Sequence, residues 1–328
     1  MALLIVRYLN QGVPRWGKLI SQAPSSAAAH IEVAPLKTRA TTTAALITAF
    51  DARELDEVEQ PIALEAAALL SPITSDATLV CQGLNYVGHA AEARHHERKQ
   101  NLFFAKASSS LTGPFNNIER PPEVQLLDYE VEFAVVLRAP LGPTINVDDE
   151  NLGDYVAGVV LCNDVSARDV MFGASFLQWY QGKSYRTFCP AGPVLYLLEK
   201  TEAPRVLANI EIKLWVNGEL RQSASSSQLI FKPAETLNQL SKIVDLKAGD
   251  LLLTGTPAGV TAPASPKLIE ILKTNLMADD LRRAALRTEM AAYRAFLKPG
   301  DVVTATLHDR AFDTSLGGLE NYIASGEQ

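Results

Sequence analysis

The alternation of apolar and polar positions predicts a chain made mainly of short β-strands. Apolar runs rich in Val, Ile, Leu and Phe are separated by Gly, Pro, Asn and Asp, which favour turns. Helical patterns between the runs are too few to cover both faces of a parallel sheet. We therefore predict a mixed α+β, β-rich fold whose strands form a mixed or antiparallel sandwich or roll. The predicted strands are residues 78–81, 130–137, 156–162, 194–198, 210–216, 251–254 and 302–307.

The N-terminal segment has a pattern of its own. Residues 3–20 predict a β-hairpin around the turn-like Asn10-Gln11-Gly12, and the proline-flanked residues 62–70 predict a helix. After that helix, β-rich runs dominate. We therefore predict a small N-terminal α/β domain over residues 1–75 and a larger domain over residues 76–328.

A helical interval at about 262–296 interrupts the larger domain. Ser265-Pro266 is a favourable helix start, and apolar residues recur among many charges after it. This pattern predicts one or two amphipathic helices that pack on their own domain rather than on a partner, because most amphipathic stripes complete a core. The recurring apolar residues are Leu268, Leu272, Leu276, Leu281, Leu286, Tyr293 and Phe296.

Composition narrows the class of protein. Among 328 residues, 47% are hydrophobic and 20% are charged, which is the balance of a globular chain rather than a disordered one. The 30 Lys and Arg residues against 37 Asp and Glu residues give a net charge of −7, so we expect no nucleic-acid partner. The sequence has neither a P-loop nor a G-x-G-x-x-G after a strand, so no nucleotide fingerprint is present.

The cysteines and apolar runs bear on location. Three cysteines without C-x-x-C spacing indicate neither a disulfide framework nor a thiolate zinc site. The opening MALLIV is too short for a signal peptide, and no later run approaches the roughly 18 apolar residues that cross a bilayer. We therefore expect a cytoplasmic protein that does not bind membranes.

Two carboxylates share one face of a predicted strand. In DYEVEFAVVL at 128–137, period-two geometry places Glu130 and Glu132 together, about 6.6 Å apart at about 3.3 Å per residue. Buried carboxylates this close need protons or a cation, and oxygen ligands suit Mg²⁺, Mn²⁺ or Ca²⁺. Asp164, where the strand at 156–162 ends, could complete a three-carboxylate site. A solvated polar face and a helix N-cap at Asp164 are the alternatives.

A histidine and a glutamate lie three residues apart in GLNYVGHAAE at 83–92. On a helix, His89 and Glu92 are neighbours, so the carboxylate can orient the imidazole as a base that activates water. A surface His/Glu pair is the alternative. Zinc bound through His89, His95 or His96 is a third interpretation, although their spacing fits no standard ligand set.

Seven segments in a consistent order resemble the fumarylacetoacetate hydrolase family. The resemblance covers roughly residues 78–261 and 297–323, and RYLNQGVPRWGKLI near the start is similar to the family's small N-terminal domain. The segments are GLNYVGHAAE, DYEVEFAVVL, CNDVSARD, GKSYRTFCPAGP, LLLTGTPAGV, LKPGD and GGLENYI. The resemblance implies a mixed β-sandwich roll with a catalytic domain over 76–328, and a homodimer.

The same resemblance implies roles for individual residues. Glu130, Glu132 and Asp164 match the positions that hold Mg²⁺ or Mn²⁺ in the family, whereas His89 and Glu92 match its catalytic dyad on a mobile lid.

Further along the chain, Lys183 matches the active-site lysine, which can stabilise an oxyanion. Thr256 matches a residue that contacts the substrate's carboxylate end, and we expect Gly255 and Arg168 to bind substrate as well. Two departures leave the substrate open: Arg186 stands where the family commonly has an acidic residue, and the interval at 262–296 replaces a short connection.

The activity that the resemblance implies is hydrolysis of a carbon–carbon bond in an acylpyruvate or fumarylacetoacetate-like β-diketo acid. Such a reaction serves the breakdown of aromatic or related compounds, and its substrate is a small 2-oxo or β-diketo carboxylate. An oxaloacetate-type decarboxylase or a dienol isomerase on the same metal site is the first alternative. A non-catalytic, metal-dependent carboxylate-binding protein is the second.

Overall fold

The computed structural model describes residues 2–57, 60–92, 100–262, 266–274, 277–291 and 296–326. Within these ranges the strands are β1 (Leu3–Asn10), β2 (Val13–Leu19), β3 (His30–Lys37), β4 (Asp56–Glu57), β5 (Ile62–Glu65), β6 (Leu69–Leu70), β7 (Leu79–Gly83), β8 (Leu102–Lys106), β9 (Leu111–Thr112), β10 (Ile118–Arg120), β11 (Leu127–Asp128), β12 (Val131–Leu137), β13 (Val156–Asn163), β14 (Ser166–Ala167), β15 (Cys189–Leu197), β16 (Ile210–Val216), β17 (Glu219–Ser225), β18 (Leu251–Leu253), β19 (Val302–Asp309) and β20 (Thr314–Ser325). The α-helices are α1 (Thr43–Asp51), α2 (Val87–Glu92), α3 (Leu152–Tyr155), α4 (Arg168–Gly173), α5 (Trp179–Lys183), α6 (Ala203–Leu207), α7 (Pro233–Leu240), α8 (Pro266–Thr274) and α9 (Asp279–Met290).

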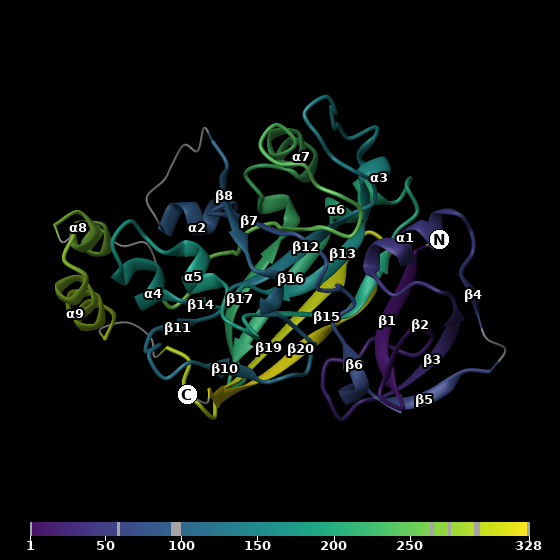
Figure 1. The fold of residues 1–328 in the computed structure, drawn as a ribbon, viewed down its shortest axis with the longest axis horizontal. Coiled ribbons are helices and arrows are strands. Elements are labelled where there is room, and N and C mark those ends of the chain that lie inside the picture. The colour runs from purple at the N-terminus through teal and green to yellow at the C-terminus, as the bar shows by residue number, and fades with distance from the viewer. Residues whose placement is uncertain are drawn as a thin grey trace.

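Two sheets make up the body of the molecule (Figure 1). The larger has the order β4-β3-β2-β1-β15-β13-β12-β18-β7-β8, with three short strands paired beside this path. The smaller has the order β10-β20-β19-β16-β17. Parallel pairing of β18 with β7 and antiparallel pairing of β12 with β13 and β18 make the larger sheet mixed. The predicted β-rich, mixed sandwich-type fold is confirmed.

Strand β12 runs through the middle of the larger sheet and is buried on both faces. Its side chains alternate as the sequence predicts. Val131, Phe133, Val135 and Leu137 belong to a core shared with β16, β19 and β20 of the smaller sheet. Ala134 and Val136 belong to a second core on the other face, which α1 also covers. Glu130 and Glu132 lie on this second face, at the end of the strand where the apolar packing stops.

The N-terminal strands continue the larger sheet. Strand β1 pairs antiparallel with β15 and with β2, so the predicted hairpin is confirmed. The helix predicted for residues 62–70 is wrong: β5 pairs with β3, Ala66–Ala68 form a single 3₁₀ turn, and β6 pairs with β1. A segment this short does not form a stable isolated helix, so pairing with neighbouring strands decides its conformation. The domain boundary at residue 75 stays a prediction.

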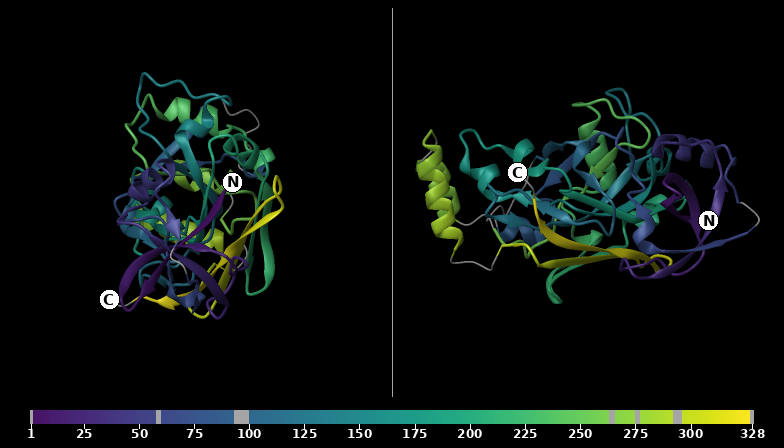
Figure 2. Two further views of the ribbon diagram at one scale, coloured as in Figure 1. Left: turned by 90° about the vertical axis from the view of Figure 1, so that its right-hand side faces the viewer. Right: turned by 60° about the horizontal axis from the view of Figure 1, so that its bottom comes forward.

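The interval at 262–296 contains α8 and α9, as its amphipathic pattern predicts. These helices lie at the end of the molecule opposite the N-terminal strands (Figures 1 and 2). Leu268, Leu286 and Met290 form a third apolar cluster with Leu126, and α9 packs on α4. The interval therefore packs on its own domain. Leu281 is an exception to the stripe, because it is exposed, and Leu276 and Tyr293 lie outside the described residues.

In the part of the chain that the structure describes, no helix combines the length and the apolar character that crossing a membrane requires. The three cysteines, Cys81, Cys162 and Cys189, are buried and free. This agrees with the expectation from their spacing that they form no disulfide framework.

Burial on both faces of β12 predicts a large stability loss from truncating one of its side chains. Leu137→Ala should lower the free energy of unfolding by about 2 to 5 kcal/mol, because it removes a fully buried side chain and leaves a cavity. Chemical denaturation followed by circular dichroism measures the loss. The exposed Leu220→Ala serves as the matched control and should stay within about 0.5 kcal/mol of the unaltered protein. Equal effects from the two variants would contradict this account of the core.

Candidate active site

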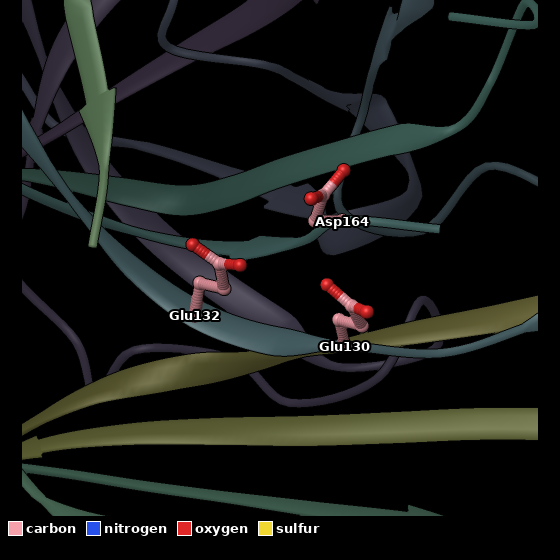
Figure 3. Close-up of side chains that lie close together, drawn as sticks. All are labelled: Glu130, Glu132 and Asp164. Carbon is pink, nitrogen blue, oxygen red and sulfur yellow. The ribbon is translucent and has the colours of Figure 1, made fainter. Parts of the chain in front are cut away.

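Glu130, Glu132 and Asp164 form a buried cluster of three carboxylates (Figure 3). One oxygen from each lies within 4.8 Å of the others. Strand pairing produces this arrangement: Glu132 lies opposite Cys162 in the ladder between β12 and β13, and the Asp164 amide donates to the Glu130 carbonyl at 2.8 Å. The three residues that the sequence singled out as metal ligands are thus brought together.

Three cationic side chains surround the carboxylates. Lys183 Nζ donates to Glu130 Oε2 at 2.7 Å and to Asp164 Oδ2 at 2.6 Å. Lys106 Nζ donates to Asp164 Oδ1 at 2.6 Å. Arg168 donates from Nη2 to Glu130 and from Nε to Asp128 Oδ2, the latter at 2.9 Å. Both Asp164 oxygens therefore accept from lysines, and this carboxylate is not used as a helix N-cap.

The two glutamates differ in their electrostatic surroundings. Burial by itself raises the pKa of Glu130, but Lys183 and Arg168 outweigh burial and hold this pKa below its usual range. Burial raises the pKa of Glu132 well above its usual range, and the neighbouring Asp164 and Glu130 carboxylates raise it further. No described residue forms an ion pair with Glu132, whose Oε2 accepts from the Gly255 amide at 2.7 Å. Glu132 is therefore the carboxylate of the cluster that has no direct ion pair with a described residue, although the nearby Lys183 opposes the rise of its pKa.

The cluster fits a divalent cation. Its donors are all carboxylate oxygens, the preferred ligands of hard cations such as Mg²⁺ and Mn²⁺. A carboxylate has about four lone-pair positions, so Glu130 and Asp164 keep acceptor capacity beside their hydrogen bonds to cationic side chains. Counting Asp128, four carboxylates accompany the cationic Lys106, Lys183 and Arg168, so one negative charge is left for a cation to balance once Glu132 has lost its proton.

His89 and Glu92 form the predicted pair on α2. His89 Nδ1 and Glu92 Oε2 are 3.2 Å apart, and the Gly259 amide donates to Glu92 Oε1 at 3.3 Å. The imidazole is largely buried and the carboxylate is partly exposed. Because Glu92 engages Nδ1, the other ring nitrogen is available to act on a substrate or a water molecule. His95 and His96, named in the zinc interpretation, lie outside the described residues.

A cavity of about 150 Å³ joins these groups. Its polar lining consists of Gln82, His89, Glu130, Arg168, Lys183 and Thr256. The rest of the described lining is mostly apolar and comes from β8, α4, α5 and α8. The candidate base His89, the buried Lys183 and one carboxylate of the cluster therefore open into one space.

The residues expected to bind substrate occupy different positions. Thr256 lines the cavity, and its hydroxyl donates to the Val131 carbonyl at 3.0 Å. Gly255 has φ +93°, a backbone conformation that favours glycine and that turns its amide toward Glu132. Arg168 lines the cavity while paired with two carboxylates. Arg186 is exposed and is not part of the cavity lining. Substrate contacts at Thr256, Gly255 and Arg168 stay predictions.

Sequence reasoning missed two charged residues of the site. Lys106 ends β8, far in sequence from the carboxylate it binds, and only its place after an apolar strand marks it. Asp128 accepts from Arg168 and from the Thr261 and Ala262 amides, so it anchors the loop that leads into the helical interval. The signal that could have identified Asp128 as a site residue was its position at the start of the DYEVEF motif.

A strand-rich sandwich with a carboxylate triad and a His/Glu dyad at one cavity is the arrangement that the sequence motifs implied. Residues 78–324 match the family model described as fumarylacetoacetate (FAA) hydrolase C-terminal. The chain belongs to the fumarylacetoacetate hydrolase family.

Named relatives and a solved structure agree with this membership. A Bos taurus protein named oxaloacetate tautomerase FAHD2B, mitochondrial, is 41% identical over 191 residues, which are 58% of this chain and only 59% of that relative. The fumarylacetoacetate hydrolase domain-containing protein 2 homolog of Dictyostelium discoideum is 35% identical over 272 residues, 80% of this chain and 76% of its own length. The crystal structure of a probable 2-hydroxyhepta-2,4-diene-1,7-dioate isomerase from Mycobacterium abscessus has a TM-score of 0.70 and 27% identity, covering 100% of both chains.

Binding of a divalent ion is expected to release a proton, because the raised pKa of Glu132 favours its protonated form and a cation must displace that proton. Affinity should therefore fall as the pH is lowered. Titration calorimetry with Mg²⁺ in buffers of different ionisation enthalpy measures both quantities. Glu132→Gln should lose most of the affinity and the proton release, with little loss of stability. The exposed Glu219→Gln is the control, and an unchanged affinity in Glu132→Gln would remove Glu132 from the ligand set.

Proposed function

We propose that this protein is a divalent-metal-dependent enzyme that hydrolyses a carbon–carbon bond in an acylpyruvate or a related β-diketo acid. The observation that supports this proposal is that a candidate general base and a candidate metal site lie at the same cavity. His89, oriented by Glu92, lines the same space as Glu130 of the carboxylate cluster. In such a cavity, the base can activate water for attack on a carbonyl carbon. A cation held beside it can stabilise the negative charge of the leaving group.

Mg²⁺ or Mn²⁺, with Ca²⁺ as a further option, would be held by Glu130, Glu132 and Asp164 and would supply Lewis acidity to the oxygens of a 2-oxo carboxylate. With a divalent ion, the carboxylate cluster, Asp128 and the cationic Lys106, Lys183 and Arg168 would together carry one net positive charge. This excess suits a substrate that brings one carboxylate into the cavity.

His89 has the part of general base in this mechanism. Its free ring nitrogen takes a proton from water, whose oxygen adds to the acyl carbonyl that lies farther from the carboxylate. The bond between this carbon and the adjacent methylene then breaks, and its electron pair stays with the departing 2-oxo acid as the enolate. Proton return to the methylene carbon gives a carboxylic acid and pyruvate. Glu92 orients the imidazole through its contact with Nδ1.

Lys183 is suited to stabilise negative charge rather than to act as a base. Burial lowers the pKa of Lys183, but the Asp164 and Glu130 carboxylates outweigh burial and raise this pKa, so the amine stays charged. An ammonium group has three donors, and two are directed to these carboxylates. The third is left for the developing oxyanion of the substrate.

Keto–enol tautomerisation of a 2-oxo acid such as oxaloacetate is the second candidate. The names of the Bos taurus relative and of the Mycobacterium abscessus structure favour it, because tautomerase and isomerase reactions both move a proton beside a carbonyl. His89 could transfer that proton without activating water. Decarboxylation of oxaloacetate would use the cation site but not the base. A non-catalytic carboxylate-binding role would be excluded by turnover of any of these substrates.

The cytoplasmic location and the homodimer stay proposals. The Bos taurus relative is named as mitochondrial, and light scattering on the purified protein would determine the oligomeric state.

A substrate panel tests the proposed function directly. Acylpyruvates, a fumarylpyruvate-like diketone and oxaloacetate should be assayed after chelation, with and without added Mg²⁺ or Mn²⁺. We expect pyruvate release from acylpyruvates, lost on chelation and restored by the metal. Full activity in excess chelator, in protein without detectable metal, would contradict the proposed site. Enol–keto conversion of oxaloacetate without hydrolysis of any acylpyruvate would establish the second candidate.

Removal of the base separates the candidate reactions. His89→Ala should slow acylpyruvate hydrolysis by about a hundred- to ten-thousand-fold and leave Mg²⁺ binding intact, because the imidazole activates water but holds no cation. Oxaloacetate decarboxylation should suffer less. Glu92→Gln should act in the same direction more mildly. His308→Ala is a matched control, since His308 forms a similar pair with Asp313 away from the cavity. Hydrolysis at an unaltered rate in His89→Ala would rule out this mechanism.

A further inference from the structure

The helical interval supplies one wall of the cavity, and this wall is apolar. Leu268, Ile269 and Leu272 of α8 line the cavity together with groups of the carboxylate site. We propose that this wall makes the enzyme selective for substrates whose acyl group ends in a compact apolar group, such as a branched alkyl chain or a phenyl ring, rather than in a second carboxylate. This inference rests on the proposed function and defines its substrate class.

Packing holds the α8 wall in position. Leu268 is buried, and it shares an apolar cluster with Ile271 of the same helix and with Leu286 and Met290 of α9. Helix α9 packs in turn on α4, which begins at Arg168 of the carboxylate site. The wall is therefore tied to the body of the domain through side-chain packing.

Aromatic rings form another part of the cavity wall. Phe104 of β8 lies 5.2 Å from Trp179 of α5, and Phe172 of α4 meets the same indole edge-on at 6.1 Å between ring centroids. All three rings line the cavity. Lys183 Nζ lies 5.2 Å from the centroid of Phe104, so the apolar surface begins directly beside the charged site. A substrate held at the carboxylates would thus place its distal end between aromatic and aliphatic side chains.

The charged residues that line the cavity also favour substrates whose distal end is apolar. Among the described lining residues, the lysine and the arginine, Lys183 and Arg168, are both paired with carboxylates of the site. A second substrate carboxylate at the apolar end would lose water without gaining a cationic partner, which is unfavourable. An apolar group of suitable size would gain from the same burial.

A pair of substrates of nearly equal shape tests the proposal. Succinylpyruvate has an acyl group that ends in a carboxylate, and its analogue with isopropyl in place of that carboxylate has similar size and branching. With saturating Mg²⁺, we expect kcat/KM for the isopropyl compound to be at least about tenfold higher, since apolar pockets discriminate roughly 10- to 200-fold per methylene-sized group. An equal or higher kcat/KM for succinylpyruvate would overturn the proposal while leaving the hydrolase intact.

Charge substitutions in the wall locate the selectivity. Leu272→Lys and the partly exposed Ile269→Lys each place a cation at the apolar end, and each should shift the ratio toward succinylpyruvate by at least about tenfold. Two variants are used so that misfolding of one leaves the other informative. Leu281→Lys is the matched control, because Leu281 is an exposed leucine of the same interval outside the cavity lining. A ratio unchanged in both wall variants would remove α8 from substrate selection.

Failure of the proposed function would show itself differently, as no turnover of either acylpyruvate. In that case, the binding of small 2-oxo acids tests the apolar wall formed by α8. Titration calorimetry with Mg²⁺ compares 2-oxoglutarate with the analogue in which isopropyl replaces its distal carboxylate. Tighter binding of the isopropyl analogue, reversed in Leu272→Lys or Ile269→Lys, supports the apolar site without hydrolysis. Equal or tighter binding of 2-oxoglutarate, or no binding of either compound, overturns it.

Discussion

Three carboxylates held side by side in a buried site impose the constraint on which the rest of this structure depends. Each loses hydration and repels its neighbours, so the fold must bring compensating charge from elsewhere. Lys106 arrives at the end of β8, Lys183 at the end of α5, and Arg168 at the start of α4. The strands and helices around β12 are thus arranged so that their ends converge on one point. Glu132 alone is left for an added cation to compensate.

Local periodicity explains what could be predicted. The alternation in residues 131–137 placed one set of side chains in each of two cores and put Glu130 and Glu132 on a common face. The apolar run before Asp164 predicted a strand with this carboxylate at its end, and antiparallel pairing of that strand with β12 is what brings Asp164 to the two glutamates. His89 and Glu92 followed from helical spacing over less than one turn. These features depend on residues close together in the chain.

Features that depend on contacts between residues far apart in the sequence could not be predicted from local periodicity. Residues 62–70 are apolar and rich in alanine, yet they extend because β3 and β1 offer backbone partners that no local pattern reveals. Lys106 binds a carboxylate 58 positions away, which only the tertiary structure shows. The amphipathic pattern of α8 predicted burial, but it did not distinguish side chains that fill a core from those that line a cavity.

The apolar cluster around α8 and α9 is separate from the two cores that hold the sheets together. Substitutions in the wall therefore alter the shape and polarity of the cavity while the main cores keep their packing. Substitutions in α8 are therefore expected to disturb the packing of the two sheets less than substitutions in β12, because they lie in a separate cluster. Under the proposed function, natural selection can redirect this scaffold to new acyl groups through the helical interval alone, while the carboxylate cluster and the His89–Glu92 pair stay unchanged.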